Sequence, residues 1–395
     1  MNEVQAPILQ DGMMMDLKTL AATPIQSIVQ QTGSIMDIPP ETPVTAEEPK
    51  SALQEALEDP YAVMMQDFRQ VQIEKLAKFD KEAWATGSGY EAPNFPMWNE
   101  KMEGLGNGFY IFAGFPNCGK TAYMLNLAMD YAKYEKNHLY LLYFTLDDSA
   151  QKLIPRIISM NKEIPISVSA KPRRYQEMIE NGAEGSSVFQ KMLEKRSEGL
   201  EELNMLSSHF LIQEQSDIQC AEKMLNLAKM YKTFVRMEDP KANLLVAVDS
   251  LMDINIDSAN DRDEKERNTR ISRMMKDWAE NQLQCPVFGS AHLRKNTAGR
   301  RPQVSDLKES GRYEYDATAI FLIANDVSRS GQNADIYYSS PNDDEKHPVF
   351  EIQWAKNKAS SFKERTYCFF TPEYSKATEC SKELAAQFDA KIYSL

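Results

Sequence analysis

The octapeptide from Gly114 to Thr121 contains residue types that suit a bound phosphate group. It reads GFPNCGKT and fits the pattern G-x-x-x-x-G-K-[ST]. Glycines let backbone N–H groups wrap phosphate oxygens, a lysine reaches the β- and γ-phosphates, and the final hydroxyl binds Mg²⁺. The sequence therefore predicts a nucleotide site that binds ATP and Mg²⁺. Its members are Gly114, Asn117, Cys118, Gly119, Lys120 and Thr121, with Thr121 also a metal ligand.

Carboxylates follow two apolar runs and could complete this chemistry. Asp249 ends the run from Leu244 and suits a Mg²⁺ shell, because ligands gather at the carboxyl ends of strands in parallel sheets. Hydrolysis also needs a base for water, and Asp147 is our first candidate, with Asp148 second. Either aspartate could instead cap the helix that begins at Ala150.

Cations and one histidine lie after later strands. His292 follows a fifth strand and could contact the γ-phosphate, or be structural. The loop from Arg294 to Arg301 suits a nucleic-acid backbone, although a solvated charge run is the alternative. Its basic members are Arg294, Lys295, Arg300 and Arg301. Lys356 and Lys358 end a late strand and could reach a nucleotide across a subunit boundary, or simply be solvated.

The elements that must position these residues form an α/β pattern. Phe109–Ala113 reads as a buried strand before the glycine-rich loop, and an amphipathic helix follows the loop. Strands then alternate with helices, which predicts a mostly parallel sheet, and late hairpins predict antiparallel strands at the end. The further predicted strands are residues 138–145, 209–213, 244–249, 286–290, 317–324, 335–340, 349–356 and 365–370. Residues 150–206 and 218–232 are predicted to be helical, as is the segment that ends at Trp278.

Charge is uneven along the chain. The net charge of the 395 residues is −13; residues 1–60 hold ten acids and two lysines, so they carry −8 and the remainder carries −5. The acidic balance therefore argues only weakly against nucleic acid. No run of about 18 apolar residues and no secretory pattern occurs, and the five cysteines lack C-x-x-C spacing. We expect reduced thiols, no membrane span, no zinc site and a cytoplasmic protein.

Three regions follow from composition and periodicity. Residues 1–50 are expected to be a disordered acidic tail, since apolar periodicity is poor and aromatics are absent. Residues 51–86 look helical, split by Pro60, and the helix from Tyr61 to Glu82 could pack on a neighbouring subunit or cap its own domain. Residues 87–395 hold the α/β domain.

These residues together resemble the RecA-like ATPase domain of DnaB-family replicative helicases. Residues 301–311, RPQVSDLKESG, followed by Asp316-Ala317, are similar to the family's R-P-x-x-S-D-L-R-E-S-G…D-A signature. Residues 144–147, 290–293 and 355–358 resemble its F-S-L-E, S-Q-L and G-K-x-R segments. The resemblance covers about Gly89 to Phe370.

The resemblance implies a ring-forming, ATP-dependent DNA helicase, with a homo-hexamer, single-stranded DNA and replisome proteins such as primase or a loader as partners. It implies that His292 senses the γ-phosphate and that Lys356 and Lys358 act on the γ-phosphate bound by the neighbouring subunit. It also implies DNA contacts for Lys308, Glu309 and Gly311. Three departures indicate a divergent, phage-type member: Asp147 for glutamate, Lys358 for arginine, and a long segment from Asn161 to Met205. A RecA/RadA-type recombinase and an ATP-binding assembly or loading factor with weakened hydrolysis are the alternatives.

Overall fold

The structure, a computed structural model, describes residues 60–86, 89–216, 220–256, 264–294, 300–307, 311–339 and 345–394. The chain divides into two units, Met1–Glu82 and Ala83–Leu395. The predicted acidic tail, residues 1–50, lies outside the described residues. Among the described residues, no helix is both long and apolar enough to cross a membrane.

Helix α4 (Pro60–Thr86) is the described element of the N-terminal region. It confirms the helix expected from Tyr61 to Glu82, and its first residue, Pro60, suits the first turn of a helix because that position needs no N–H donor. Large apolar side chains on α4 are exposed within the structure: Met64, Met65, Phe68, Val71, Ile73, Leu76 and Phe79.

In the described part of the second unit, a ten-stranded sheet organises the fold. Its strands along one path are ordered β10-β9-β8-β6-β1-β5-β4-β2-β3, and β7 pairs with β8. Strands β6, β1, β5, β4, β2 and β3 pair in parallel, whereas β8, β9 and β10 are antiparallel, so the predicted α/β class is confirmed. The bounds are β1 Gly108–Gly114, β2 Leu139–Thr145, β3 Phe210–Glu214, β4 Asn243–Asp249, β5 Pro286–His292, β6 Ala319–Asn325, β7 Tyr337–Tyr338, β8 His347–Asn357, β9 Arg365–Thr371 and β10 Lys376–Glu379.

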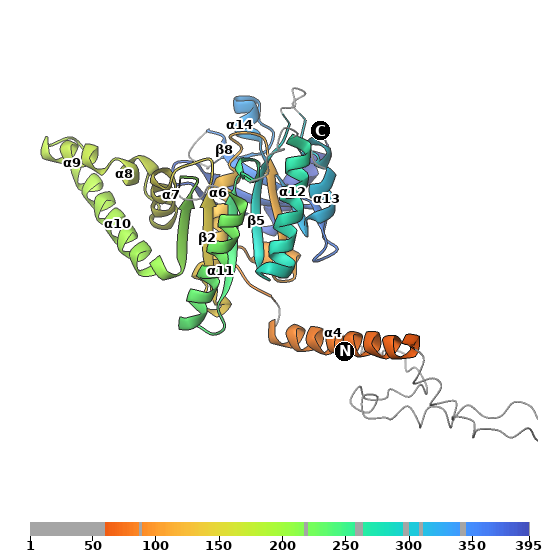
Figure 1. Cartoon of the computed structure of the whole chain (residues 1–395). Helices are drawn as coiled ribbons and strands as arrows, with labels where there is room; N and C mark the ends of the chain where they lie inside the picture. Colours follow the sequence, from red (N-terminus) through yellow and green to blue (C-terminus); the bar gives the residue numbers. More distant parts are fainter. Residues whose placement is uncertain are drawn as a thin grey trace, which may run out of the picture. The chain divides into compact units, whose positions relative to one another are not determined.

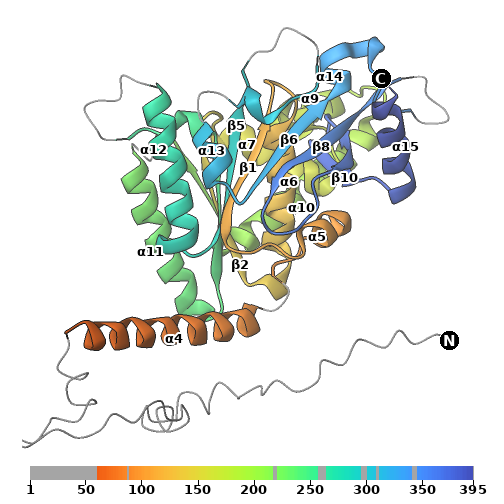
Figure 2. The same cartoon turned by 90° about the vertical axis from the view of Figure 1, so that its right-hand side faces the viewer.

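The central strands β1, β2 and β4 are buried at every position. Both faces of the sheet are therefore covered, and helices provide that cover. One core cluster lies between the sheet and α6 with α5, and the other lies between the sheet and α11 with α12. Figures 1 and 2 show α11 and α12 on one face and α6 on the other. These helices are α5 Pro96–Met102, α6 Lys120–Lys133, α11 Ala221–Glu238 and α12 Glu264–Asp277, which continues as a π-helical turn, Trp278–Gln282.

The long segment noted in the sequence is a group of helices that reaches away from the sheet (Figure 1). Its helices are α8 Ile166–Ala170, α9 Pro172–Glu180 and α10 Ser186–Met205, and they pack on α7 Ala150–Lys162, which precedes them. A small apolar cluster around Ile158, Ile164 and Val168 holds it together. Gly199 lets α10 approach α7, since a Cβ there would lie 2.9 Å from Ile158 Cγ2.

Several elements differ from the sequence-based prediction. Helix α5, strand β10 and helix α15 (Lys382–Tyr393) were not predicted, and the strand expected over residues 335–340 is limited, among the described residues, to the two residues of β7. Short helices α13 (Gly311–Asp316) and α14 (Asp326–Ser330) also flank β6. The five cysteines, all of them described, are free and buried.

Candidate active site and basic loop

The glycine-rich loop connects the end of β1 to the start of α6. Two of its residues have a positive φ, 61° at Asn117 and 96° at Gly119. A Cβ added to Gly119 would lie 2.6 Å from Phe350 Cε1, and one added to Gly114 would lie 2.5 Å from Cys118 Sγ. Glycine is therefore required at both positions, since any side chain would collide with its neighbours.

The first turn of α6 presents donors at this loop. The helix has Gly119 at its N-cap and no side-chain hydrogen bond there, so the first backbone N–H groups are available for an anion. Lys120 is buried and its Nζ donates to the carbonyl of Phe115, 3.1 Å away, within the loop itself. Burial raises the pKa of the Cys118 thiol, which is therefore protonated at neutral pH.

Asp249 is held rigidly at the end of β4. The carboxylate is buried and accepts one hydrogen bond at each oxygen, from the Tyr143 hydroxyl at 3.1 Å and from the Ser290 hydroxyl. Sequence reasoning missed Tyr143, although a tyrosine in a fully buried strand needs a partner for its hydroxyl. That requirement is the signal that could have pointed to it.

Asp147 lies beside Asp249 at the neighbouring strand end. Its backbone N–H donates to the Asp249 carbonyl at 3.3 Å, and its side chain is exposed. Asp148 instead pairs with Lys152 at 3.2 Å and Arg156 at 3.0 Å. The N-cap of α7 is Ser149, without a side-chain cap bond, so neither aspartate caps this helix. Of the two aspartates, Asp147 has the more exposed side chain, so it is the one we expect to face a ligand.

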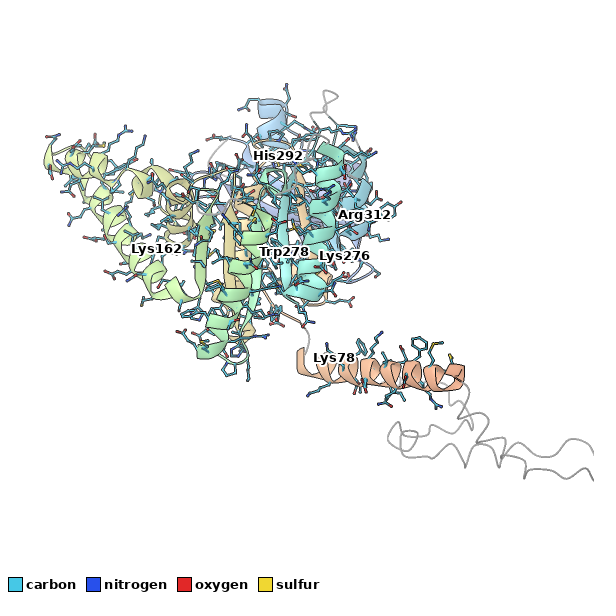
Figure 3. The ribbon with its side chains drawn as sticks, in the orientation of Figure 1. Lys78, Lys162, Lys276, Trp278, His292 and Arg312 are labelled. Atoms are coloured by element: carbon cyan, nitrogen blue, oxygen red, sulfur yellow. The ribbon has the colours of Figure 1, made fainter. Side chains whose placement is uncertain are left out.

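His292 ends β5 and pairs in register with Gly114 at the start of the loop. Figure 3 shows its side chain at the upper edge of the sheet. Burial lowers the pKa of His292, and the nearby Lys120 lowers it further, against the opposing effect of Asp147 and other carboxylates. The lowered pKa favours the neutral imidazole, which could hydrogen-bond a phosphate oxygen.

This donor set fits a nucleotide with Mg²⁺. The magnesium ion takes oxygen ligands, and Thr121 in the first turn of α6 and Asp249 at the end of β4 offer a hydroxyl and a carboxylate. The first backbone N–H groups of α6, which no side chain caps, and the Lys120 ammonium can donate to negatively charged phosphate oxygens. Bound Mg²⁺ and ATP would supply a phosphate bond to cleave and an ion that neutralises charge as the bond breaks.

The described residues at both ends of the basic loop, Arg294–Arg301, are held by contacts with Asp306 and Glu351. Arg300 donates to both oxygens of Asp306, at 2.9 and 2.5 Å, and Arg301 donates through Nε to Glu351 at 2.9 Å. The backbone N–H of Arg294 donates to the Asp306 carbonyl at 2.8 Å. The predicted DNA-binding residues Lys295, Lys308 and Glu309 lie outside the described residues.

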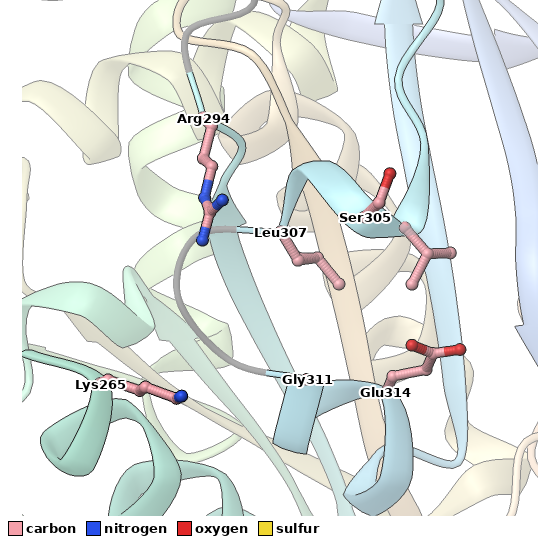
Figure 4. Close-up of a pocket in the computed structure, with 7 residues that line it drawn as sticks. Lys265, Arg294, Ser305, Leu307, Gly311 and Glu314 are labelled. Atoms are coloured by element: carbon pink, nitrogen blue, oxygen red, sulfur yellow. The ribbon is translucent and has the colours of Figure 1, made fainter.

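A cavity of about 540 Å³ lies between Arg294 after β5, residues 304–314 and the start of α12 (Figure 4). Arg294, Gly311 and Glu314 line it together with Lys265 of α12, so the predicted Arg294 and Gly311 lie at one site. Its remaining lining residues are Val304, Ser305 and Leu307.

Lys356 and Lys358 lie away from the glycine-rich loop of their own chain. Lys356 pairs in register with Ile320 near the start of β6, whereas Gly114, which ends β1, pairs with Ile323. Lys358 donates to the Tyr315 carbonyl at 3.2 Å, and Lys356 donates to the carbonyl of Glu314 in α13. The structure does not bring these two lysines to the site formed by residues 114–121.

Comparison with known proteins shows similarity to one family of helicases. The pattern of the family described as "DnaB-like helicase C terminal domain" matches residues 92–379. A protein called "Probable replicative DNA helicase" from Trieres chinensis is 26% identical over 276 residues, which cover 65% of this chain and 53% of that protein. "Replicative DNA helicase DnaB" of Mycoplasma pneumoniae is 25% identical over 245 residues, covering 56% of this chain and 46% of the relative. The chain thus spans about half the length of these relatives.

Two solved structures share the fold. The structure called "ATPase Domain of G40P" has a TM-score of 0.61 and 21% identity, and covers 78% of this chain and 98% of its own. "The Structure Of A DnaB-Like Replicative Helicase And Its Interactions With Primase" has a TM-score of 0.61 and 20% identity, covering 83% of this chain and 74% of its own. Because the family pattern matches well over half of the residues, this chain belongs to the DnaB-like helicase C-terminal domain family.

Proposed function

We propose that the protein is an ATP-dependent replicative DNA helicase that assembles into a homo-hexameric ring and translocates on single-stranded DNA. The observation that carries the proposal is one sheet edge that combines the glycine-rich loop, the fixed Asp249 and the exposed Asp147. Membership of the DnaB-like family directs that phosphate chemistry toward DNA.

Each side chain has a separate task in this proposal. The N-terminus of α6 and Lys120 bind the phosphates, for which Lys120 must leave the Phe115 carbonyl. Asp249, oriented by Tyr143 and Ser290, holds the metal shell with Thr121. Asp147 accepts the proton of the attacking water, and the neutral His292 contacts the γ-phosphate.

DNA contacts are assigned to the segment from Arg294 to Gly311. Its cations would neutralise backbone phosphates, and five of the seven residues that line the 540 Å³ cavity belong to the same segment. We assign Lys356 and Lys358 to the nucleotide of a neighbouring subunit, because they do not lie at their own. The exposed apolar side chains of α4 suit docking on another copy of the chain. A replisome protein such as primase is a further candidate partner, because one of the two similar structures is named for its interactions with primase.

The central test compares the wild type with Lys120→Ala. We expect ATP hydrolysis that single-stranded DNA stimulates, unwinding of a forked duplex, and loss of both in the variant. A Lys120→Ala protein that hydrolyses ATP normally contradicts the proposal. Imaging with ATP and single-stranded DNA separates rings from the open filaments of a recombinase.

A second candidate function has one observation in its favour. Asp147 and Lys358 replace a glutamate and an arginine of the family pattern, which favours an ATP-binding assembly or loading factor with weak hydrolysis. Assembly with ATP but no turnover on DNA would support this candidate over the helicase.

A further inference from the structure

The base of the basic loop is closed by several independent contacts. Leu293 and Leu307 form an antiparallel bridge, and the Arg294 N–H donates to the Asp306 carbonyl at 2.8 Å. The carboxylate of Asp306, whose side chain is 9% exposed, then receives both ends of the Arg300 guanidinium. Arg294 and Arg300, the described residues on either side of the loop, are therefore both held by Asp306.

Arg301 extends this closure to the sheet. Its Nε lies 2.9 Å from Glu351 Oε2 on β8, and Arg365 Nε of β9 lies 2.9 Å from the other oxygen, Glu351 Oε1. The Glu351 side chain is only 6% exposed and that of Arg301 is 22% exposed. A carboxylate buried to this degree needs its cationic partners, because it has lost most of its water.

Strand β8 and the residues that follow it also contact the glycine-rich loop and helix α13. Phe350, the residue before Glu351, packs its ring against Gly119 of the glycine-rich loop. Further along the chain, Lys356 and Lys358 donate to carbonyls near the end of α13, the helix that follows residues 308–310. The Arg301–Glu351 pair thus attaches the basic loop to the strand that borders the nucleotide site.

We propose that Arg301 is a positioning residue that joins the described end of the basic loop, Arg300 and Arg301, to β8 through Glu351, and that it does not itself neutralise a DNA phosphate. This inference rests on the proposed function, since it concerns the same DNA-binding segment. It assigns a different task to a cation that its sequence position alone placed among the DNA contacts. Phosphate neutralisation is left to loop cations such as Lys295.

Salt dependence separates an anchor from a phosphate contact. Each phosphate that a protein neutralises adds about 0.7 to the slope of log affinity against log salt for single-stranded DNA. The experiment measures single-stranded DNA affinity at four salt concentrations for the full chain and the variants Arg301→Gln, Glu351→Gln and Lys295→Gln. Arg365→Gln is the matched control, because it removes an arginine from the same carboxylate but leaves the loop attached.

We expect Arg301→Gln and Glu351→Gln to weaken binding about tenfold each with the wild-type slope, and the double variant to be no weaker than either one. Lys295→Gln should lower the slope by about 0.7, and Arg365→Gln should bind as the wild type does. If Arg301→Gln lowers the slope as Lys295→Gln does while Glu351→Gln binds normally, the proposal is overturned. Normal binding by both Arg301→Gln and Glu351→Gln overturns it as well.

Two further measurements keep the result interpretable. Thermal unfolding of each variant shows whether the buried pair was also needed for folding. If Arg301→Gln is unfolded, Arg301→Lys takes its place, because it keeps the charge but lacks the Nε that meets Glu351. An anchor then predicts weaker binding, and a phosphate contact predicts unchanged binding. Failure of the helicase proposal would be distinct, since the wild type itself would then show no DNA-stimulated turnover.

Discussion

At the scale of single residues, the two aspartates after β2 differ in what they already contact. Asp148 is paired with Lys152 and Arg156, whereas the Asp147 side chain is exposed beside Asp249. We expect Asp147→Asn to lower kcat by a factor of about 10² to 10⁴, the usual contribution of a general base. Asp148→Asn should change kcat only slightly. Steady-state kinetics on both variants decides, and equal losses would show that Asp147 is not the base.

Tyr143 offers a test of how Asp249 is oriented. Tyr143→Phe removes the donor 3.1 Å from Asp249 Oδ2 and leaves the Ser290 hydroxyl in place. We expect the Mg²⁺ concentration for half-maximal turnover to rise about tenfold, the scale of one hydrogen bond to a charged group. Tyr110→Phe is the control, because it also removes the hydroxyl of a buried tyrosine, one that donates to the Gly106 carbonyl. A Mg²⁺ requirement unchanged in Tyr143→Phe, or raised equally in both variants, would contradict this role.

The ammonium of Lys356 is expected to make turnover depend on pH. Burial lowers the pKa of Lys356 to about 8, and repulsion from Lys358 contributes. The cation is therefore lost as the pH rises through about 8, so turnover that needs it in trans should fall on the alkaline side. Lys356→Arg should remove that decline, since a guanidinium stays charged. The measurement is kcat from pH 7 to pH 10 for both proteins. A decline that persists in Lys356→Arg must come from another group.

At the scale of elements, a distant carboxylate supports α5. Glu379 at the end of β10 accepts the backbone N–H groups of Met97 and Trp98, at 2.7 and 2.8 Å. Burial raises the pKa of Glu379 from 4.5 to about 7, with Asp130 and Glu100 adding repulsion against those two hydrogen bonds. The folded state therefore binds this proton more tightly than the unfolded chain, and stability contributed by Glu379 decreases as the pH rises from about 4.5 to about 7.

The matching variant is Glu379→Gln, which keeps an acceptor oxygen but does not ionise. We expect the free energy of unfolding to vary less with pH over that interval than in the wild type. Urea unfolding at pH 5, 6 and 7 measures this difference, and Glu383→Gln, an exposed acid on α15, is the control. Identical pH profiles for Glu379→Gln and the wild type would show that Glu379 is ionised throughout.

The same elements show what the sequence could predict. Strands β1, β2, β4 and β5 were predicted because they are continuous apolar runs, and their carboxyl ends located Asp147, Asp249 and His292. Helix α5 has only seven residues, and its support comes from Glu379, 281 residues beyond Trp98 in the chain, so no local pattern predicts it. The Arg301–Glu351 pair depends in the same way on two segments 50 residues apart.

At the scale of the whole molecule, the active site is proposed to be complete only between two copies of the chain. Lys356 pairs with Ile320 near the start of β6, and the Lys358 backbone N–H donates to the Thr318 carbonyl just before it, while the glycine-rich loop follows the end of β1. In a ring with repeated head-to-tail interfaces, each site would combine the loop of one subunit with the lysines of the next. The two sets of residues can then be inactivated on different chains.

Mixing two inactive variants tests this arrangement. Lys120→Ala lacks the phosphate lysine and Lys358→Ala lacks a trans cation, so each alone should hydrolyse little ATP on DNA. In equal random mixtures, about one interface in four joins an intact loop to an intact Lys358, so activity should recover toward a quarter of the wild-type value. Mixing Lys120→Ala with itself at twice the concentration is the control for assembly. If both groups instead served one chain, no mixture would exceed the residual activity of its parts, because every active site would contain a lesion.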